Sequence, residues 1–138
     1  MVLWEMGLAT RESFSENLRG VCTAQGWELL PSGVNVVHAN GRHQLITIEH
    51  FESSGLQLIR LVSMIGITKE LPRERMEQAL RANMSLAHGA LALNGGDLCM
   101  TDTLSLEEAD PGEIESAISY LAEWADYYEQ ILFGIDHH

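Results

Sequence analysis

The stretch from Pro72 to Leu106 constrains the fold more than any other part of this 138-residue chain. Its first part, which ends at Met84, carries apolar residues at helical spacing, and two short apolar runs follow. The residues at 94–96, Asn-Gly-Gly, separate the two runs and favour a tight turn between antiparallel strands, because Asn and Gly tolerate positive φ. We therefore predict a helix followed by a β-hairpin.

Short strands are also predicted before this helix, at residues 27–30, 34–38, 43–51 and 56–67. Turn residues separate them, and the Asn-Gly at 40–41 is the strongest hairpin signal among these turns. The last run is the longest, and apolar residues occupy both its even-numbered and its odd-numbered positions. This pattern indicates a strand that is buried on both faces, or one that a partner covers on one face.

Two more helices are predicted, one near each end of the chain. Residues 11–25 form the first, with Thr10 as a plausible N-cap, whereas the role of residues 1–9 stays open. The second begins at Asp110, where Asp-Pro-Gly-Glu is typical of a capping box. Its predicted buried stripe consists of Ile114, Ile118, Leu121, Ala125, Tyr128 and Leu132. Its predicted solvent side carries Glu115, Glu123, Asp126 and Glu129.

These elements predict an α+β fold in one domain over residues 1–138, in the order α-β-β-β-α-β-β-α. Short connections favour antiparallel neighbours, so we expect an antiparallel sheet of about five strands with three helices on one side. The other face of such a sheet is left to water or to a partner.

The charge of the chain is uneven and argues against nucleic acid. The formal net charge is −12, and Arg81 is the last Lys or Arg, whereas eleven of the 20 acidic residues follow it. A polyanion or an anionic membrane surface would be repelled by this half. The N-terminus lacks the basic and apolar regions of a signal peptide, and no apolar run is long enough to span a membrane. We therefore expect a cytoplasmic protein.

The sequence offers little chemistry. Cys22 and Cys99 are far apart in unlike elements, which favours reduced, buried thiols. A two-residue turn at 40–41 would place His38 and His43 opposite each other, but two imidazoles make an incomplete metal site. No nucleophile motif or phosphate-binding loop is present. We predict no catalytic residues, no metal and no cofactor, and keep a small metal-dependent enzyme built on the histidines as an alternative.

The apolar residues of the sheet exceed what three helices on one side can cover, and exposed apolar patches mark interaction sites. We therefore predict that a partner protein contacts one sheet face, through Ile46, Ile48, Ile59 and Leu61. The stripe formed by Met76, Leu80 and Met84 is a second candidate, because Met adapts to varied partners.

The segments 80–84, 89–93, 97–100 and 104–106 resemble the type III secretion chaperone-like superfamily, which includes CesT-type chaperones and YbjN-like proteins. The shared pattern is a helix that ends in Leu-x-x-Asn (Leu80 to Asn83), a strand that begins at a Gly (Gly89), a Gly-containing hairpin and a second strand. The segment 122–129 resembles the last helix of the YbjN-like branch.

The resemblance implies a small acidic, non-enzymatic protein that is often a homodimer. In the secretion chaperones, the dimer binds an extended segment of an effector. The helix before the hairpin commonly forms the dimer interface, which here would contain Met76, Leu80 and Met84. The resemblance to the YbjN-like branch implies a regulatory or stress-linked role of undefined biochemistry as the alternative.

Overall fold

The structure is a computed structural model in which residues 3–134 are described, with side chains from residue 11 onward. Three α-helices and six strands follow one another along the chain, with one turn of 3-10 helix, η1 (Thr68–Glu70), before the second α-helix. The helices are α1 (Leu3–Gln25), α2 (Arg73–Ala82) and α3 (Pro111–Leu132). The strands are β1 (Glu28–Leu30), β2 (Gly33–Val37), β3 (His43–Ser53), β4 (Leu56–Ile67), β5 (Ala90–Asn94) and β6 (Asp97–Ser105).

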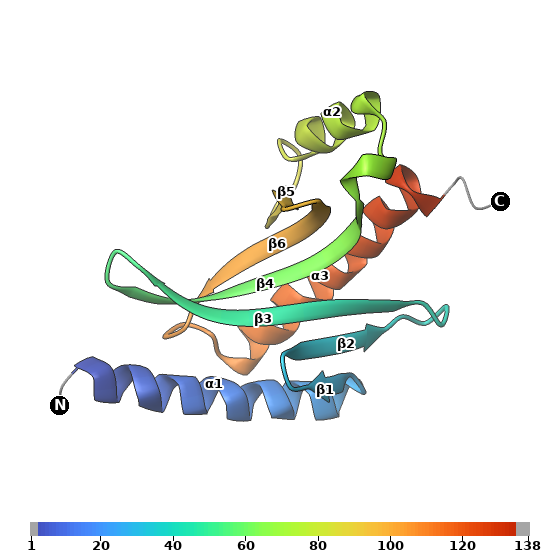
Figure 1. Cartoon of the computed structure of the whole chain (residues 1–138). Helices are drawn as coiled ribbons and strands as arrows, with labels where there is room; N and C mark the ends of the chain where they lie inside the picture. The colour runs from blue at the N-terminus through green and yellow to red at the C-terminus, as the bar shows by residue number, and fades with distance from the viewer. Residues whose placement is uncertain (1–2, 135–138) are drawn as a thin grey trace.

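The strands form one antiparallel sheet in the order β1-β2-β3-β4-β6-β5. The predicted α+β class and antiparallel pairing are confirmed. The sheet has six strands rather than about five, because the three-residue strand β1 pairs with β2. The two long strands β3 and β4 lie at its centre, and β4 separates the N-terminal strands from the β5–β6 hairpin (Figure 1).

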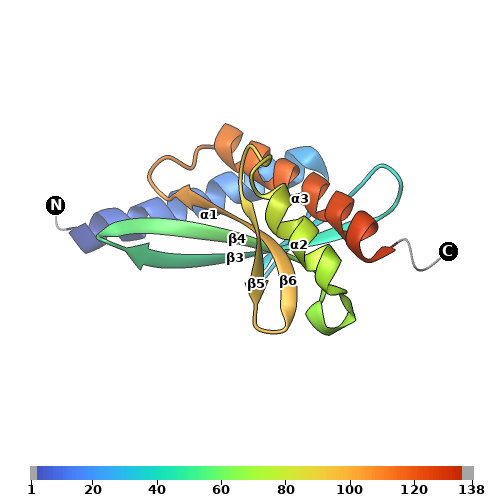
Figure 2. The ribbon, with the colours of Figure 1, turned by 90° about the horizontal axis from the view of Figure 1, so that it is seen from above.

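Helices α1 and α3 lie on one face of the sheet, as Figures 1 and 2 show together. Helix α3 packs across β3, β4 and β6, whereas α1 contacts β1 and α3. The core lies between these helices and the sheet, and each residue of the stripe predicted for α3 is buried. Its most deeply buried large side chains are Ile46, Ile59, Leu61, Met100, Ile114, Ile118 and Leu121.

The predicted start is wrong for α1 and correct for α3. Helix α1 begins at Leu3, so Thr10 lies inside it and the predicted N-cap at Thr10 is wrong. The cap of α3 is confirmed, because the Asp110 carboxylate accepts a hydrogen bond from the Glu113 N–H at 2.8 Å and Pro111 occupies the first helical position.

The β2–β3 hairpin has a different register from the predicted one. His43 pairs with Val37, and the His38 N–H donates to the Arg42 carbonyl at 2.8 Å across a three-residue loop. Gly41 takes the positive φ (85°) that such a loop needs. His38 and His43 are therefore not opposite each other, and the predicted proximity of their imidazoles is wrong.

Candidate protein-binding surface

The four sheet residues predicted to contact a partner lie on the face that the helices cover. Ile46, Ile59 and Leu61 are completely buried, and Ile48 is half-buried against the core. Their side chains lie on the same face of the sheet as Ser63, whose hydroxyl accepts a hydrogen bond from the buried Gln44 side chain. The prediction that these residues contact a partner is therefore wrong, because the helices pack on them. A partner could reach only the side chains that point to the opposite face of the sheet.

The opposite face of the sheet, which we call the open face, turns away from α1 and α3 (Figure 1). Alternation along the paired strands brings apolar side chains to it, and Leu45 and Met64 are 50% and 51% exposed. Its apolar members on β2, β3 and β4 are Val37, Leu45, Phe51, Leu56, Leu58, Val62 and Met64. These residues form an apolar surface across neighbouring strands.

Arg60 is the cation of the open face, and nearby groups already hold it. Its guanidinium carbon lies 4.0 Å from the centroid of the Phe51 ring, and its Nη1 lies 3.5 Å from Glu49 Oε1. Glu49 and Arg60 are directly paired across β3 and β4. The pair is partly exposed and adds little to stability. It divides the open face into an apolar end at Leu45 and Met64 and a mixed end at the β3–β4 turn.

The two edges of the sheet differ in their capacity to accept another strand. The outer edge of β5 is closed near its start, because Asn83 hydrogen-bonds the backbone of Leu91 there. The other edge is β1, which is only three residues long and is followed by Pro31. An extended peptide that adds a strand needs a free row of backbone groups. The open face is therefore a better candidate for a partner contact than either edge.

A hollow of about 250 Å³ lies between α1 and the first three strands. Phe14 and Leu18 from α1 face Leu29, Ile48 and His50 across it. The Phe14 and His50 rings meet edge to face with centroids 5.6 Å apart. Burial lowers the pKa of the His50 imidazole, and the charge of Arg11 lowers it further. The wall of this hollow is mixed, because Ser15, Arg19 and Ser32 also line it.

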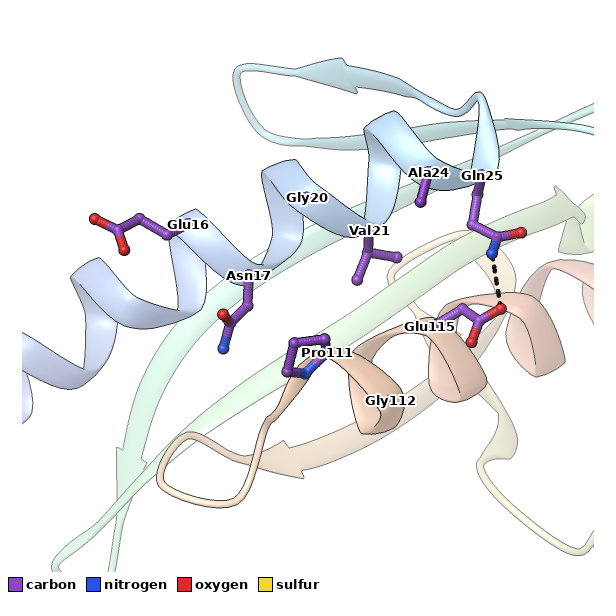
Figure 3. Close-up of a pocket in the computed structure, with 9 residues that line it drawn as sticks. All are labelled: Glu16, Asn17, Gly20, Val21, Ala24, Gln25, Pro111, Gly112 and Glu115. Atoms are coloured by element: carbon purple, nitrogen blue, oxygen red, sulfur yellow. Dashed lines mark hydrogen bonds between the residues drawn. The ribbon is translucent and has the colours of Figure 1, made fainter.

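A second hollow of about 340 Å³ lies between α1 and the start of α3 (Figure 3). Small residues, including Gly20, Ala24 and Gly112, line much of it. At one end the Gln25 Nε2 donates to Glu115 Oε1 at 2.8 Å and links the two helices. Glu115, which was predicted to face solvent, is thus half-buried and bonded to α1.

Of the three residues predicted for a dimer interface, Met76 and Leu80 lie on α2, and Met84 lies in the turn that follows it. Met76 is half-buried and packs on the core. Leu80 and Met84 are 68% and 91% exposed, and Ala79 is the buried residue of the helix. Arg75 fixes α2 to the rest of the fold by donating to the Leu132 carbonyl, at 3.1 Å, at the end of α3. Leu80 and Met84 are accessible in this structure.

A polar cluster joins the β2–β3 loop to α3, and sequence reasoning missed it. Arg42 Nε lies 2.6 Å from Asp126 Oδ1, and Gln130 Nε2 donates to Asp126 Oδ2 at 2.8 Å. The hydrogen bond that Arg42 donates to Asp126 raises the pKa of the Arg42 guanidinium. Asp126 was predicted on the solvent side of α3 but is buried, since Arg42 neutralises it. No local signal relates residues 84 positions apart in the sequence.

Other sites of chemistry are sparse in the described part of the chain. Cys22 and Cys99 are free and buried, as predicted, and burial raises the pKa of both thiols. Among the described side chains, no three His, Cys, Asp or Glu residues form a cluster that could hold a metal ion. None of the helices, over the residues described, is long and apolar enough to cross a membrane.

The fold of this chain is similar to those of solved structures from two protein complexes. One match is the HopA1-SchA chaperone-effector complex, with a TM-score of 0.59 and 13% identity over 85% of this chain and 93% of the matched chain. The chain has a type III secretion chaperone-like fold. A further match with this fold is the heterodimeric ExoU-SpcU complex from the type III secretion system of Pseudomonas aeruginosa. Its TM-score is 0.56, with 20% identity over 83% of this chain and 97% of the matched chain.

The likeness is one of structure, since no family model and no curated protein sequence matches the chain. The fold predicted from the resemblance is therefore confirmed by the structural comparison.

Proposed function

We propose that this protein is a non-enzymatic chaperone-like module that binds an extended segment of a partner protein on the open face of its sheet. The observation that carries the proposal is the apolar surface around Leu45, Val62 and Met64. These side chains lie on adjacent strands and are turned away from the helices. The two similar structures are a chaperone–effector complex and a secretion-system heterodimer, which supports a protein partner.

The open face suits an extended segment better than a small molecule. Its exposed apolar residues are spread over several strands rather than gathered in one enclosed cavity. An apolar patch of this kind on a protein surface marks a protein contact more often than a ligand site. The −12 charge would keep such a protein soluble while the patch is unoccupied.

We also propose that the protein forms a homodimer through the outer side of α2. Leu80, on this helix, and Met84, in the turn just after it, are both exposed. The contact would use the same surface of both copies, since most homodimers are symmetric. Met76 would support the interface from beneath, because its side chain packs on the core.

The test of partner binding is capture of the protein from its own host, followed by mass spectrometry, with variants of the open face. Met64→Asp combined with Leu45→Asp places two charges in the apolar surface. We expect one dominant partner on the wild type and its loss from the double variant. Ser119→Asp, at an exposed position on α3, is the matched control and should keep the partner. Equal capture by both variants would remove the open face from the proposal.

The dimer is tested separately by light scattering. The exposed pair Leu80→Asp and Met84→Asp should give a monomer, whereas Gln78→Asp, exposed on the same helix, should remain a dimer. A monomeric wild type would refute the dimer without affecting the open face. A regulatory role like that suggested for YbjN-like proteins is the second candidate, and it is favoured if only background proteins are captured.

A further inference from the structure

Helix α3 carries a row of aromatic side chains that the proposed function does not use. We call Tyr120, Trp124 and Tyr127 the aromatic row. The Tyr120 and Trp124 ring centroids are 6.0 Å apart, and those of Trp124 and Tyr127 are 5.2 Å apart. His88, from the loop before β5, extends the row with its ring 5.3 Å from Tyr120. Tyr127 is 47% exposed, so one end of the row is accessible.

A hollow of about 270 Å³ lies beside the first residue of the row, between β6 and α3. Its lining combines an apolar floor, an aromatic wall and two carboxylates. It consists of His88, Asp102, Leu104, Glu113, Ser116, Ala117 and Tyr120. The Tyr120 hydroxyl accepts hydrogen bonds from the Ala87 and His88 N–H groups, which fixes the loop that forms one side.

The two carboxylates of this hollow have no cation beside them in the described structure. Asp102 Oδ1 accepts a hydrogen bond from the Thr103 N–H, and neither Asp102 nor Glu113 takes part in a described ion pair. None of the residues that line the hollow is a Lys or Arg. The chain itself cannot supply one from its C-terminal side, since no Lys or Arg follows Arg81.

Helix α3 has no Lys or Arg of its own, and the two arginines that bond to it from other elements are already engaged. Arg42 is bound to Asp126, and Arg75 donates to the carbonyl groups at the end of the helix. The aromatic row and the hollow therefore form an anionic, π-rich surface with no Lys or Arg among the residues that line the hollow. Guanidinium groups suit such a surface, because they stack on aromatic rings and pair with carboxylates through two hydrogen bonds.

We propose that the aromatic row and the adjoining hollow bind an arginine-rich segment of the partner protein. One arginine enters the hollow, with its aliphatic stem on Leu104 and Ala117 and its guanidinium between Asp102 and Glu113. A following arginine stacks on Trp124 or Tyr127. This inference rests on the proposed function for the existence of a protein partner, but it concerns a different face, because α3 lies on the other side of the sheet from the open face.

The test uses a fluorescein-labelled octapeptide of alternating arginine and serine, with fluorescence anisotropy as the measurement. Peptides with lysine or glutamate in place of arginine are the comparison. We expect the arginine peptide to bind about fivefold more tightly than the lysine peptide, because lysine has no planar group to stack. Higher salt should weaken binding. No binding of the arginine peptide, or equal binding of the glutamate peptide, would overturn the proposal.

Variants locate the peptide on the protein. Asp102→Asn combined with Glu113→Gln should lower the affinity about tenfold, through lost charge-assisted hydrogen bonds. Glu12→Gln combined with Glu16→Gln removes the same charge from exposed positions of α1 and should change the affinity less than about twofold. Tyr127→Ala should weaken binding about threefold. Equal losses from both double variants would show attraction by net charge only and would refute a site.

The same peptide separates this proposal from the proposed function. The open-face variant that combines Leu45→Asp with Met64→Asp should bind the arginine peptide as the wild type does. If the peptide fails to bind while the open face still captures a partner, only the arginine site is wrong. If the peptide binds at the row while no captured protein depends on the open face, only the proposed function is wrong.

Discussion

The side-chain amide of Asn83 pairs with the backbone of Leu91 in both directions. Its Nδ2 donates to the Leu91 carbonyl oxygen at 3.1 Å, and the Leu91 N–H donates to Asn83 Oδ1 at 2.7 Å. Because β5 is the last strand of the sheet, these backbone groups would otherwise lack a partner from a neighbouring strand. A single side chain just after α2 thus takes the place of a further strand and holds the helix against the sheet edge.

Replacing this amide should destabilise the protein and open the edge. For Asn83→Ala we expect a loss of about 1–3 kcal/mol in the free energy of unfolding, since two partly buried hydrogen bonds are removed. Urea denaturation measures it, and hydrogen exchange should show a faster Leu91 amide. Gln78→Ala, at an exposed position of α2, is the control and should change stability by less than about 0.5 kcal/mol. Unchanged exchange at Leu91 would contradict the pairing.

Gly89 is required by its conformation and by its surroundings. Its φ is 70°, and a Cβ placed on it would lie 2.6 Å from the Thr101 carbonyl oxygen. We therefore expect Gly89→Ala to cost more than about 2 kcal/mol in the free energy of unfolding, from left-handed strain together with the backbone clash. Gly96→Ala is the matched control, since a Cβ there meets nothing within 4 Å. Thermal melts of the two variants should differ clearly, and similar melts would argue against the clash.

The sequence predicted most of the fold because the local signals were strong. The spacing of buried residues in α3 and the Asp110 cap follow from helix geometry alone, and the Asn-Gly-Gly turn specified the β5–β6 hairpin. The β2–β3 register was not predictable in the same way. Asn-Gly fits a two-residue turn as well as the three-residue loop with Gly41 at positive φ, and a shift of one residue moves His43 opposite Val37.

The candidate site was predicted less well. The alternation of side chains along a strand assigns residues to two faces of the sheet, but it does not identify the face that the helices cover. Ile46 and Leu61 are among the most apolar residues of their strands, and for that reason they lie under the helices. The available face carries Leu45 and Met64 instead. The burial of Asp126 could not be predicted from local sequence either, because it depends on Arg42, which comes from a distant part of the chain.

Ser54 is strained in a way that a substitution can relieve. It is the non-glycine residue with positive φ (51°) among those described, and it precedes Gly55 (φ 81°) in the two-residue β3–β4 turn. Such turns favour Asn-Gly, so Ser54→Asn should raise the free energy of unfolding by about 0.5–1 kcal/mol. The same change at Ser32, whose φ is not positive, should bring no gain. Differential scanning calorimetry of both variants provides the test.

Glu129 should make stability depend on pH, chiefly because its carboxyl is partly buried. Burial raises the pKa of the Glu129 carboxyl, Arg42 opposes this, Asp126 raises the pKa further, and Gln44 opposes it through a hydrogen bond. Because the pKa is higher in the folded state than the ordinary value of about 4.3, the folded state binds the proton more tightly. The resulting stability is present below that value and is lost as the pH rises through the folded-state pKa.

Glu129→Gln removes this titration while keeping the shape of the side chain. We expect the variant to be more stable than the wild type at pH 7, by less than about 1 kcal/mol, because the side chain is 38% exposed and solvent screens it. The difference should shrink as the pH falls towards 4, where the wild-type carboxyl is protonated. Urea denaturation at several pH values measures the effect, with Glu123→Gln at an exposed position of α3 as the control. A difference that stays constant with pH would mean that Glu129 acts through packing, whereas one that vanishes at low pH assigns it to the partly buried charge of the carboxylate.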